Sequence, residues 1–269
     1  SCYYLDHKAL KGRTLIYRES NIEHDYYFNL FKSERSLGRK LFFLAESLKL
    51  RFYQKQLQHS TRMLVVSQTD RDYLAAKFPH KDVVYLPSFH GNNEVKSLPG
   101  KGNYVLYHGN LSVGENLLAA QYLVKEVFND LPITFKIAGL NPPASLRGLV
   151  AAHPNMELIA NPPQTEMEQL IKNAQVNILV TFQATGLKLK LLNTLYNGRW
   201  MLVNREMLEG TGLESLCEIA ADANEMKKKI ISLYNTEFDQ NQLIMRAGIL
   251  QSRFSDEQNA RSLIREVFR

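Results

Sequence analysis

The sequence predicts an α/β protein of two units, each a parallel sheet covered by helices. From residue 103 onward, short apolar runs alternate with helix-patterned segments, which is typical of parallel sheets buried on both faces. The first hundred residues show a shorter version of the same alternation. Residues 90–103, rich in Gly, Asn and Pro, read as the linker between the two units.

Residues 1–99 are expected to form the smaller unit. Strands are predicted at residues 13–19, 62–66 and 82–87, and helices at residues 39–58 and 70–77. The long helix carries Leu41, Ala45, Leu48 and Phe52 at a spacing typical of a core-facing stripe. Tyr26, Tyr27 and Phe28 are expected in the core as well. Three strands are few for a doubly wound sheet, so we expect part of this domain to precede Ser1.

Residues 100–254 are expected to form a complete second domain, and residues 255–269 a C-terminal helix that packs back toward the first. Strands are predicted at residues 104–108, 133–139, 156–160, 176–182, 200–204 and 217–220. Helices are predicted between them, at residues 116–128, 143–152 and 166–174 and in the segment that follows residue 182.

Composition and charge restrict the classes of protein. The chain has 269 residues, two cysteines with no metal-site spacing, and no apolar run of transmembrane length, so we expect a cytoplasmic protein without a structural metal. The formal net charge is +6, and residues 32–62 alone hold eight Lys/Arg against two Glu, a balance of 8 − 2 = +6. Such a segment is either a solvated helix face or a contact for phosphate at the inner face of a membrane. A nucleic-acid partner is not expected, because no recognition module is present.

The loops that follow the strands of the second domain point to a ligand. Ligands of open parallel sheets bind beyond the carboxyl ends of the strands. Small and amide-bearing residues recur there, as in His108-Gly109-Asn110 after the first strand, and helices follow. Backbone N–H groups at helix starts favour anions, which suits a nucleotide diphosphate. Neither GxGxxG nor GxxxxGK[ST] is present, so a NAD-type or P-loop site loses its main support.

Two lysines stand near the start of the helix in residues 181–204. Lys188 and Lys190 lie at the positive end of the helix dipole, where cations are mildly unfavourable unless an anion binds. Residues two apart on a helix point in different directions, so only one of them can face a given ligand. Lys190 shares a polar stripe with Asn193, Thr194 and Asn197, so it is the preferred partner of a diphosphate.

Three segments resemble a known family. They are TGLKLKLLNTLYNGRWMLVN with EGTGL after it, YHGNLSVGENLLAA, and YRESNIEHDYY. In this order and spacing they resemble bacterial retaining GT-B glycosyltransferases of the glycosyltransferase family 4 type. The resemblance implies two Rossmann-like domains facing a cleft, the N-terminal one incomplete here. It implies transfer of a hexose from a nucleotide diphosphate sugar to a glycan or lipid-linked acceptor, with no metal and no further cofactor.

The resemblance also assigns residues. It implies catalytic roles for His24 and Lys190. On the acceptor side it implies Arg18, Asn21 and Glu23. Donor contacts are implied for Gly109, Asn110, Thr185, Gly186, Lys188, Asn193 and Thr194. Thr185 and Asn193 occupy the places of two glutamates common in the family, which leaves a nucleotide-sugar-binding or scaffolding protein of the same fold as one alternative. A GT-B nucleotide-sugar epimerase is the other.

Overall fold

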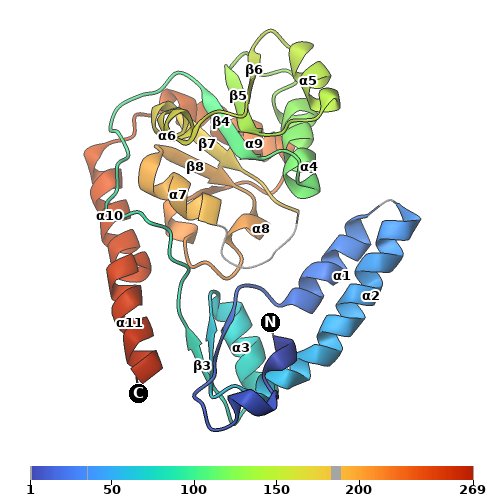
Figure 1. The fold of residues 1–269 in the computed structure, drawn as a ribbon. Coiled ribbons are helices and arrows are strands. Elements are labelled where there is room, and N and C mark those ends of the chain that lie inside the picture. Colours follow the sequence, from blue (N-terminus) through green and yellow to red (C-terminus); the bar gives the residue numbers. More distant parts are fainter. Residues whose placement is uncertain (1, 35, 183–188, 269) are drawn as a thin grey trace. The chain divides into compact units, whose positions relative to one another are not determined.

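The computed structural model describes residues 2–34, 36–182 and 189–268 (Figure 1). The described residues form two compact units. One comprises the chain up to Phe89 together with the C-terminal residues from Glu257 onward, and the other runs from His90 to Asp256. No helix among the described residues is long and apolar enough to cross a membrane.

The first unit is built on a parallel sheet. Within the described residues this sheet has three strands in the order β1-β2-β3: Ile16–Glu19, Arg62–Val65 and Asp82–Tyr85. Met63 and Val65 are fully buried, as is Leu74 of helix α3 (Gln68–Lys77), because the central strand is covered by its neighbours and by this helix. Apolar runs bounded by polar turns therefore predicted the strands correctly.

Arg62 joins three elements of the first unit. Its Nε donates to Asp82 Oδ2 at 2.8 Å, at the start of β3. Its Nη1 lies 2.9 Å from Oε2 of Glu266, in the C-terminal helix α11 (Asp256–Phe268). The guanidinium is only 16% exposed, so these partners replace water for a nearly buried charge.

Two helices of the first unit differ from the sequence prediction. Helix α1 (Glu23–Ser33) was not predicted, and helix α2 (Leu37–Tyr53) ends earlier than expected and continues as a 3₁₀ helix over Gln54–His59. Figure 1 shows α1 and α2 side by side as a helical hairpin. The expected core positions of α2 are a wrong prediction. Leu41, Leu48 and Phe52 are 60–67% exposed, and Ala45 is exposed too. Phe28 is also exposed, at 38%, while Tyr26 and Tyr27 are half-buried.

The second unit is a larger parallel sheet. Its described strands are β4 Val105–Asn110, β5 Phe135–Leu140, β6 Met156–Ala160, β7 Val176–Leu179, β8 Trp200–Val203 and β9 Glu218–Ile219. They lie in the order β6-β5-β4-β7-β8-β9. The chain thus builds outward from β4 in one direction and then, from β7, in the other. Each strand predicted in residues 100–254 is present, with ends that differ by a few residues.

Helices connect these strands. They are α4 Gly114–Tyr122 with a π-helical turn at Leu123–Val127, α5 Ala144–Ala151, α6 Gln164–Asn173, α7 Leu189–Asn197, α8 Arg205–Leu208, α9 Ala223–Asn235 and α10 Gln240–Phe254. Helices α8 and α10 were not predicted. Helix α7 buries Leu191, Leu192 and Leu195 completely, so its apolar side packs in the core and its polar residues lie on the remaining face.

Candidate functional site

The donor-side candidate lies at the switch point of the second sheet, which is the place between β4 and β7 where the order of the strands reverses direction. Strands β4 and β7 are neighbours, yet β5, β6 and their helices separate them in the chain. The crevice beyond the carboxyl ends of such a strand pair is the usual ligand position in open α/β sheets, because the following helices diverge to opposite sides there. Helix α4 follows β4, and helix α7 is the next described element after β7.

Lys190 links these two helices. Its Nζ donates to Asn116 Oδ1 of α4 at 2.9 Å and lies 5.7 Å from the centre of the Tyr107 ring. Asn116 in turn donates through Nδ2 to the carbonyl of Asn110 at the end of β4, at 3.0 Å. These contacts hold the ammonium group at the switch point, where an anion bound beyond the strand ends would meet it.

His108 and Thr194 form a buried pair beneath this lysine. His108 Nε2 lies 2.9 Å from Thr194 Oγ1, and the threonine hydroxyl donates its own proton to the carbonyl of Lys190 at 2.7 Å. His108 Nε2 must therefore carry the proton of this bond. Burial first, and the charge of Lys190 second, lower the pKa of His108 to about 3. The imidazole is thus neutral at pH 7, and of these three residues Lys190 is the one that supplies positive charge.

Two glycines allow the strand ends to approach closely. A Cβ at Gly139 would lie 1.8 Å from the carbonyl oxygen of Gly109. A Cβ at Gly109 would lie 3.2 Å from the Asn116 side chain. The ends of β4 and β5 thus present backbone and no side chain at these two positions. A phosphate can approach closely only where side chains leave such room. Asn110 shapes the next turn, because its Oδ1 accepts from the backbone N of Ser112 at 3.1 Å.

Asn193 and Thr194 have different surroundings. The Asn193 Oδ1 accepts from Nδ2 of Asn92 at 2.7 Å, so the amide oxygen of Asn193 is engaged within the fold. Thr194 is 1% exposed, so its hydroxyl positions His108 and does not reach a ligand. The proposed donor residues Thr185, Gly186 and Lys188 lie outside the described residues.

Sequence reasoning named His108 only as part of a loop after a strand, and it did not identify Asn116 or the pair Thr181–Glu115 as site residues. Thr181 follows β7, is 1% exposed, and donates through its hydroxyl to Glu115 Oε1 of α4. Its backbone N–H donates to Asn204 Oδ1 at 3.1 Å. These residues lie at strand ends or helix starts of the switch point. Their position after predicted strands was the signal that could have found them.

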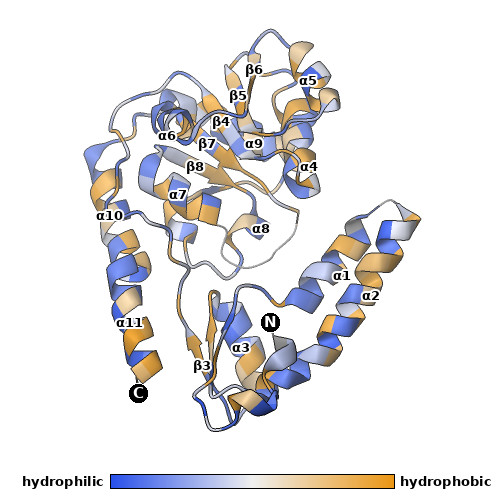
Figure 2. Ribbon diagram, viewed as in Figure 1, coloured by the Kyte–Doolittle hydropathy of each residue, from blue (hydrophilic) through white to orange (hydrophobic). Residues whose placement is uncertain are grey.

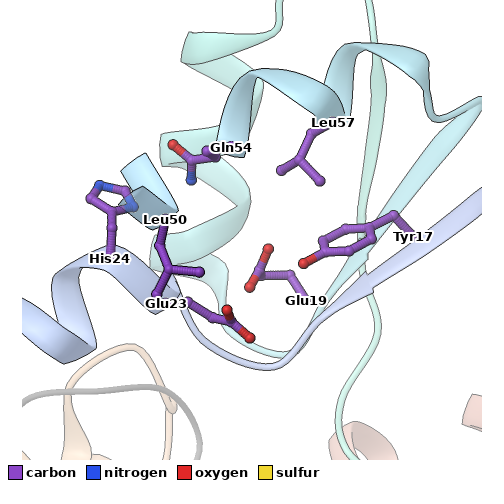
Figure 3. Close-up of a pocket in the computed structure, with 7 residues that line it drawn as sticks. All are labelled: Tyr17, Glu19, Glu23, His24, Leu50, Gln54 and Leu57. Carbon is purple, nitrogen blue, oxygen red and sulfur yellow. The ribbon is translucent and has the colours of Figure 1, made fainter. Parts of the chain in front are cut away.

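The acceptor-side candidates lie in the first unit, at the carboxyl end of β1. Figure 3 shows Glu19, Glu23 and His24 among the residues that line one small cavity, with the carboxyl groups of Glu19 and Glu23 close to each other. The cavity holds about 20 Å³, room for one water molecule. Glu19 is 5% exposed. Burial raises the pKa of Glu19 to about 8, a hydrogen bond with Tyr17 opposes this, and the charge of Glu23 adds to it.

His24 has the contacts of a helix-packing residue. It is 8% exposed, its Nε2 lies 3.5 Å from Asp25 Oδ1, and its ring centre lies 6.1 Å from that of Tyr73. Its carbonyl accepts from Oγ of Ser47 in α2 at 2.8 Å, which ties α1 to α2. Burial is the main cause that lowers the pKa of His24, and Asp25 partly opposes it. The imidazole is therefore neutral at pH 7.

The other acceptor-side residues surround the end of β1. Arg18 Nη2 donates to the carbonyl of Pro87 at 3.1 Å, and its guanidinium lies 5.4 Å from the Phe89 ring centre. Asn21 is half-buried in the bend before α1, and Glu23 is exposed in the first turn of that helix. The carboxylate of Glu23 is thus open to solvent, whereas Asn21 is partly covered.

The raised pKa of Glu19 makes stability depend on pH. Between pH 4.5 and 8 the folded chain keeps a proton that the unfolded chain releases, so the free energy of unfolding falls as pH rises. The slope is at most about 1.4 kcal/mol per pH unit. Glu19→Gln should flatten it, as measured by urea unfolding from pH 5 to 8. An equal slope in both proteins would contradict the buried, protonated carboxyl.

Solved structures provide the comparison with known proteins. TarM matches with a TM-score of 0.69 at 11% identity over 97% of this chain and 51% of TarM. An α,α-trehalose-phosphate synthase (UDP-forming) from Burkholderia xenovorans matches with a TM-score of 0.69 at 8% identity over 100% of this chain and 71% of the synthase. The GtfA/B complex matches with 0.60 at 14% identity over 81% of this chain and 48% of that chain.

Comparisons at the level of sequence find no match. No model of a protein family matches the chain, and neither does a curated protein. The chain spans about half the length of TarM. At 8–14% identity the structural matches establish architecture alone. The chain has the fold of GT-B glycosyltransferases, as the sequence predicted.

Proposed function

We propose that the chain is part of a glycosyltransferase that transfers a hexose from a nucleotide diphosphate sugar to a glycan or lipid-linked acceptor. The observation that supports this most is the ammonium group of Lys190, held between α4 and α7 at the switch point by Asn116. A diphosphate there meets a cation, the glycine-lined strand ends of β4 and β5, and the start of α4. The fold is a general indication of the same activity.

Lys190 has the principal chemical role in this proposal. As the bond between sugar and diphosphate breaks, negative charge grows on the leaving phosphate, and a fixed cation stabilises it. Gly109 and Asn110 position the diphosphate, and Thr185, Gly186 and Lys188 complete the donor site by family resemblance. With this cation in place we propose a reaction without a metal or further cofactor, and with retention of configuration. By family resemblance His24 has a catalytic role, and through its carbonyl contact with Ser47 it also holds α1, which carries Glu23. Arg18, Asn21 and Glu23 are proposed to meet the acceptor.

The ligands bound in the matching structures are consistent with this substrate class. The structure of a TarM mutant from S. aureus is a complex with fondaparinux, α-GlcNAc-glycerol and UDP. The B. xenovorans synthase structure is a complex with glucose-6-phosphate. By analogy of fold, we assign a nucleotide sugar to the second unit and a glycan-like or lipid-linked acceptor to the first. We place the enzyme in the cytoplasm, at the inner face of a membrane that the basic segment 32–62 contacts.

Asn193 is proposed to bind the ribose. Because its amide oxygen is engaged by Asn92, its amide nitrogen would donate to a ribose hydroxyl. A 2′,3′-dideoxy nucleoside diphosphate should therefore bind wild type about fivefold more weakly than the natural nucleotide. Asn193→Ala should bind the two equally. Isothermal titration with both nucleotides checks this, and a persisting preference in Asn193→Ala would exclude the contact.

Turnover tests the proposed function. The chain, mixed with nucleotide sugars and an array of glycan and lipid-linked acceptors, should release the nucleoside diphosphate and add one hexose to an acceptor, as detected by mass spectrometry. Tight binding of a nucleotide sugar without hexose transfer would favour the binding or scaffolding protein. Conversion of the sugar without an acceptor product would favour the epimerase.

A further inference from the structure

The second unit contains a cavity of about 250 Å³ at the amino ends of its strands. Its wall includes Trp200 and Glu218, the first residues of the parallel strands β8 and β9, and Gln242, Met245 and Arg246 of α10. The donor-side candidate lies at the carboxyl ends of the strands, so this amino-end cavity is a separate place. Benzene fits a cavity of about 150 Å³, so there is room here for a small organic molecule.

Arg246 places a charge on the buried side of α10. Figure 2 shows hydrophilic and hydrophobic residues alternating along this helix. Arg246 shares the buried side with Leu250 and Phe254, at a spacing of four residues. It is 3% exposed, and burial lowers its pKa to about 10, so the guanidinium is still charged at pH 7. A buried charge is costly unless a group of opposite charge lies beside it.

The fold gives this guanidinium neutral partners. Nη1 donates to the carbonyl of Gly198 at 2.5 Å and lies 3.2 Å from Ser97 Oγ, and Nη2 donates to the carbonyl of Arg199 at 2.6 Å. These carbonyls follow the C-terminal end of α7, which offsets about half of a positive charge. No acidic side chain in the described part of the chain forms an ion pair with Arg246. Part of its charge is therefore uncompensated.

The two titratable neighbours in the cavity wall do not compensate it either. Burial raises the pKa of the Cys217 thiol to about 12, so this group is neutral at pH 7. The carboxylate of Glu218 already has a partner, since its Oε2 lies 2.7 Å from Nζ of Lys229. The negative charge that Arg246 lacks would therefore come from a ligand.

The free donors of Arg246 have the geometry that a carboxylate requires. Its Nε has no hydrogen-bond partner among the described residues, and Nη2 uses one of its two N–H groups. Nε and Nη2 lie side by side on a planar guanidinium, which binds a carboxylate through two parallel hydrogen bonds.

The remaining wall of the cavity suits a molecule with hydroxyl groups. Ser215 is exposed and Gln242 is half-buried, and the side chain of neither forms a hydrogen bond with another described residue. Both side chains are therefore available to donate to a ligand hydroxyl or to accept from one. Trp200 and Met245 add apolar surface against which a carbon ring can pack.

We propose that the amino-end cavity binds a small hydroxylated monocarboxylate, such as a sugar acid. Its carboxylate lies on Nε and Nη2 of Arg246, and its hydroxyl groups face Ser215 and Gln242. A phosphate is a poorer ligand, because its second negative charge would meet the carbonyls at the end of α7 and the carboxylate of Glu218. This site goes beyond the proposed function and does not depend on it.

The only tryptophan of the chain reports on this cavity, because Trp200 forms part of its wall. Titration with glucuronate and with shikimate, two cyclic hydroxy acids, should change the fluorescence of Trp200 in a saturable manner. Glucose, which lacks the carboxylate, and glucose 6-phosphate should each bind at least about tenfold more weakly. Lys190→Ala should bind both acids like wild type, because Lys190 belongs to the donor-side candidate.

Variants of the cavity wall locate the bound acid. Arg246 is left unchanged, because it also holds the end of α7. Ser215→Ala/Gln242→Ala should lower the affinity for both acids about tenfold, because hydrogen bonds to the ligand are lost. Stability should be unchanged in urea unfolding, since the fold does not use these side chains. The matched control, Gln251→Ala/Ser252→Ala, removes the same residue types from exposed positions of α10 outside the wall and should bind like wild type.

Four results would count against the site. If neither acid binds in a saturable manner, by fluorescence or by isothermal titration, the proposal is overturned. Equal affinity for glucose would show that Arg246 does not recognise the ligand. Tighter binding of glucose 6-phosphate than of the acids would contradict the assignment to a carboxylate. An equal loss in both double variants would place the acids elsewhere on the chain.

Discussion

Lys190→Ala is expected to lower the affinity for a nucleoside diphosphate at least tenfold, about 1.4 kcal/mol. The ammonium group donates to the amide of Asn116 and lies over the Tyr107 ring, so it is fixed beside the strand ends of the switch point. A diphosphate bound there would gain a charge-assisted bond to this group, which is among the stronger contacts available to phosphate. Isothermal titration with the preferred diphosphate measures the loss.

The matched control for this variant is Lys228→Ala. Lys228 is an exposed lysine of α9, so the substitution removes the same charge from the same unit at a distance from the strand ends of the switch point. Its affinity should equal that of wild type. An unchanged affinity in Lys190→Ala would remove the central residue from the proposed site. An equal loss in both variants would reduce the effect to net charge.

Gly139→Ala is expected to lower the free energy of unfolding by about 3 kcal/mol. The new Cβ would lie 1.8 Å from the carbonyl oxygen of Gly109, and because that neighbour is backbone, the two paired strands β4 and β5 must separate. The nucleotide site should weaken with them. Urea unfolding measures the first effect, and diphosphate titration of the folded fraction measures the second.

Gly148→Ala is the control for the glycine variant. Gly148 lies in the interior of α5, and a Cβ there meets nothing within 4 Å. Alanine should stabilise this helix by about 0.5–1 kcal/mol. The two substitutions are chemically identical and should act in opposite directions. A loss below about 1 kcal/mol in Gly139→Ala would contradict the close approach of the two strand ends.

The sheet of the second unit could be predicted because its strands are short apolar runs between polar loops. Trp200–Val203 is a continuous apolar run, and the strand begins at the predicted residue and ends one residue before the predicted end. Helix α7 could be predicted from the spacing of Leu191 and Leu195. In both cases a local pattern determines the local structure, so no knowledge of distant residues is needed.

The helical hairpin could not be predicted in the same way. Leu41, Leu48 and Phe52 have the spacing of a core stripe, and this spacing predicts that a face will be covered without specifying what covers it. In the folded chain the covered face is the one with Ser47 and Leu50. Helix α1 was missed because its start is bounded by Ile22, with no side-chain cap to mark it.

The candidate site was predictable only in part. Lys190 was identified from the charge pattern of one helix. Its partner Asn116 is 74 positions away in the chain, and only the order β4-β7 in the sheet brings the two together. Thr194, expected at the ligand, is instead buried, with its hydroxyl between His108 and the carbonyl of Lys190. Long-range partners of this kind depend on strand order, which periodicity does not contain.

Ligand-observed NMR of this chain with UDP, GDP, ADP and TDP, followed by their sugar conjugates, tests the central claim most directly. The proposal predicts saturation transfer to one diphosphate in preference to the others, its displacement by the corresponding nucleotide sugar, and loss of the signal in Lys190→Ala. Absence of binding to any of the four by a chain shown to be folded by circular dichroism would contradict a donor site at the switch point.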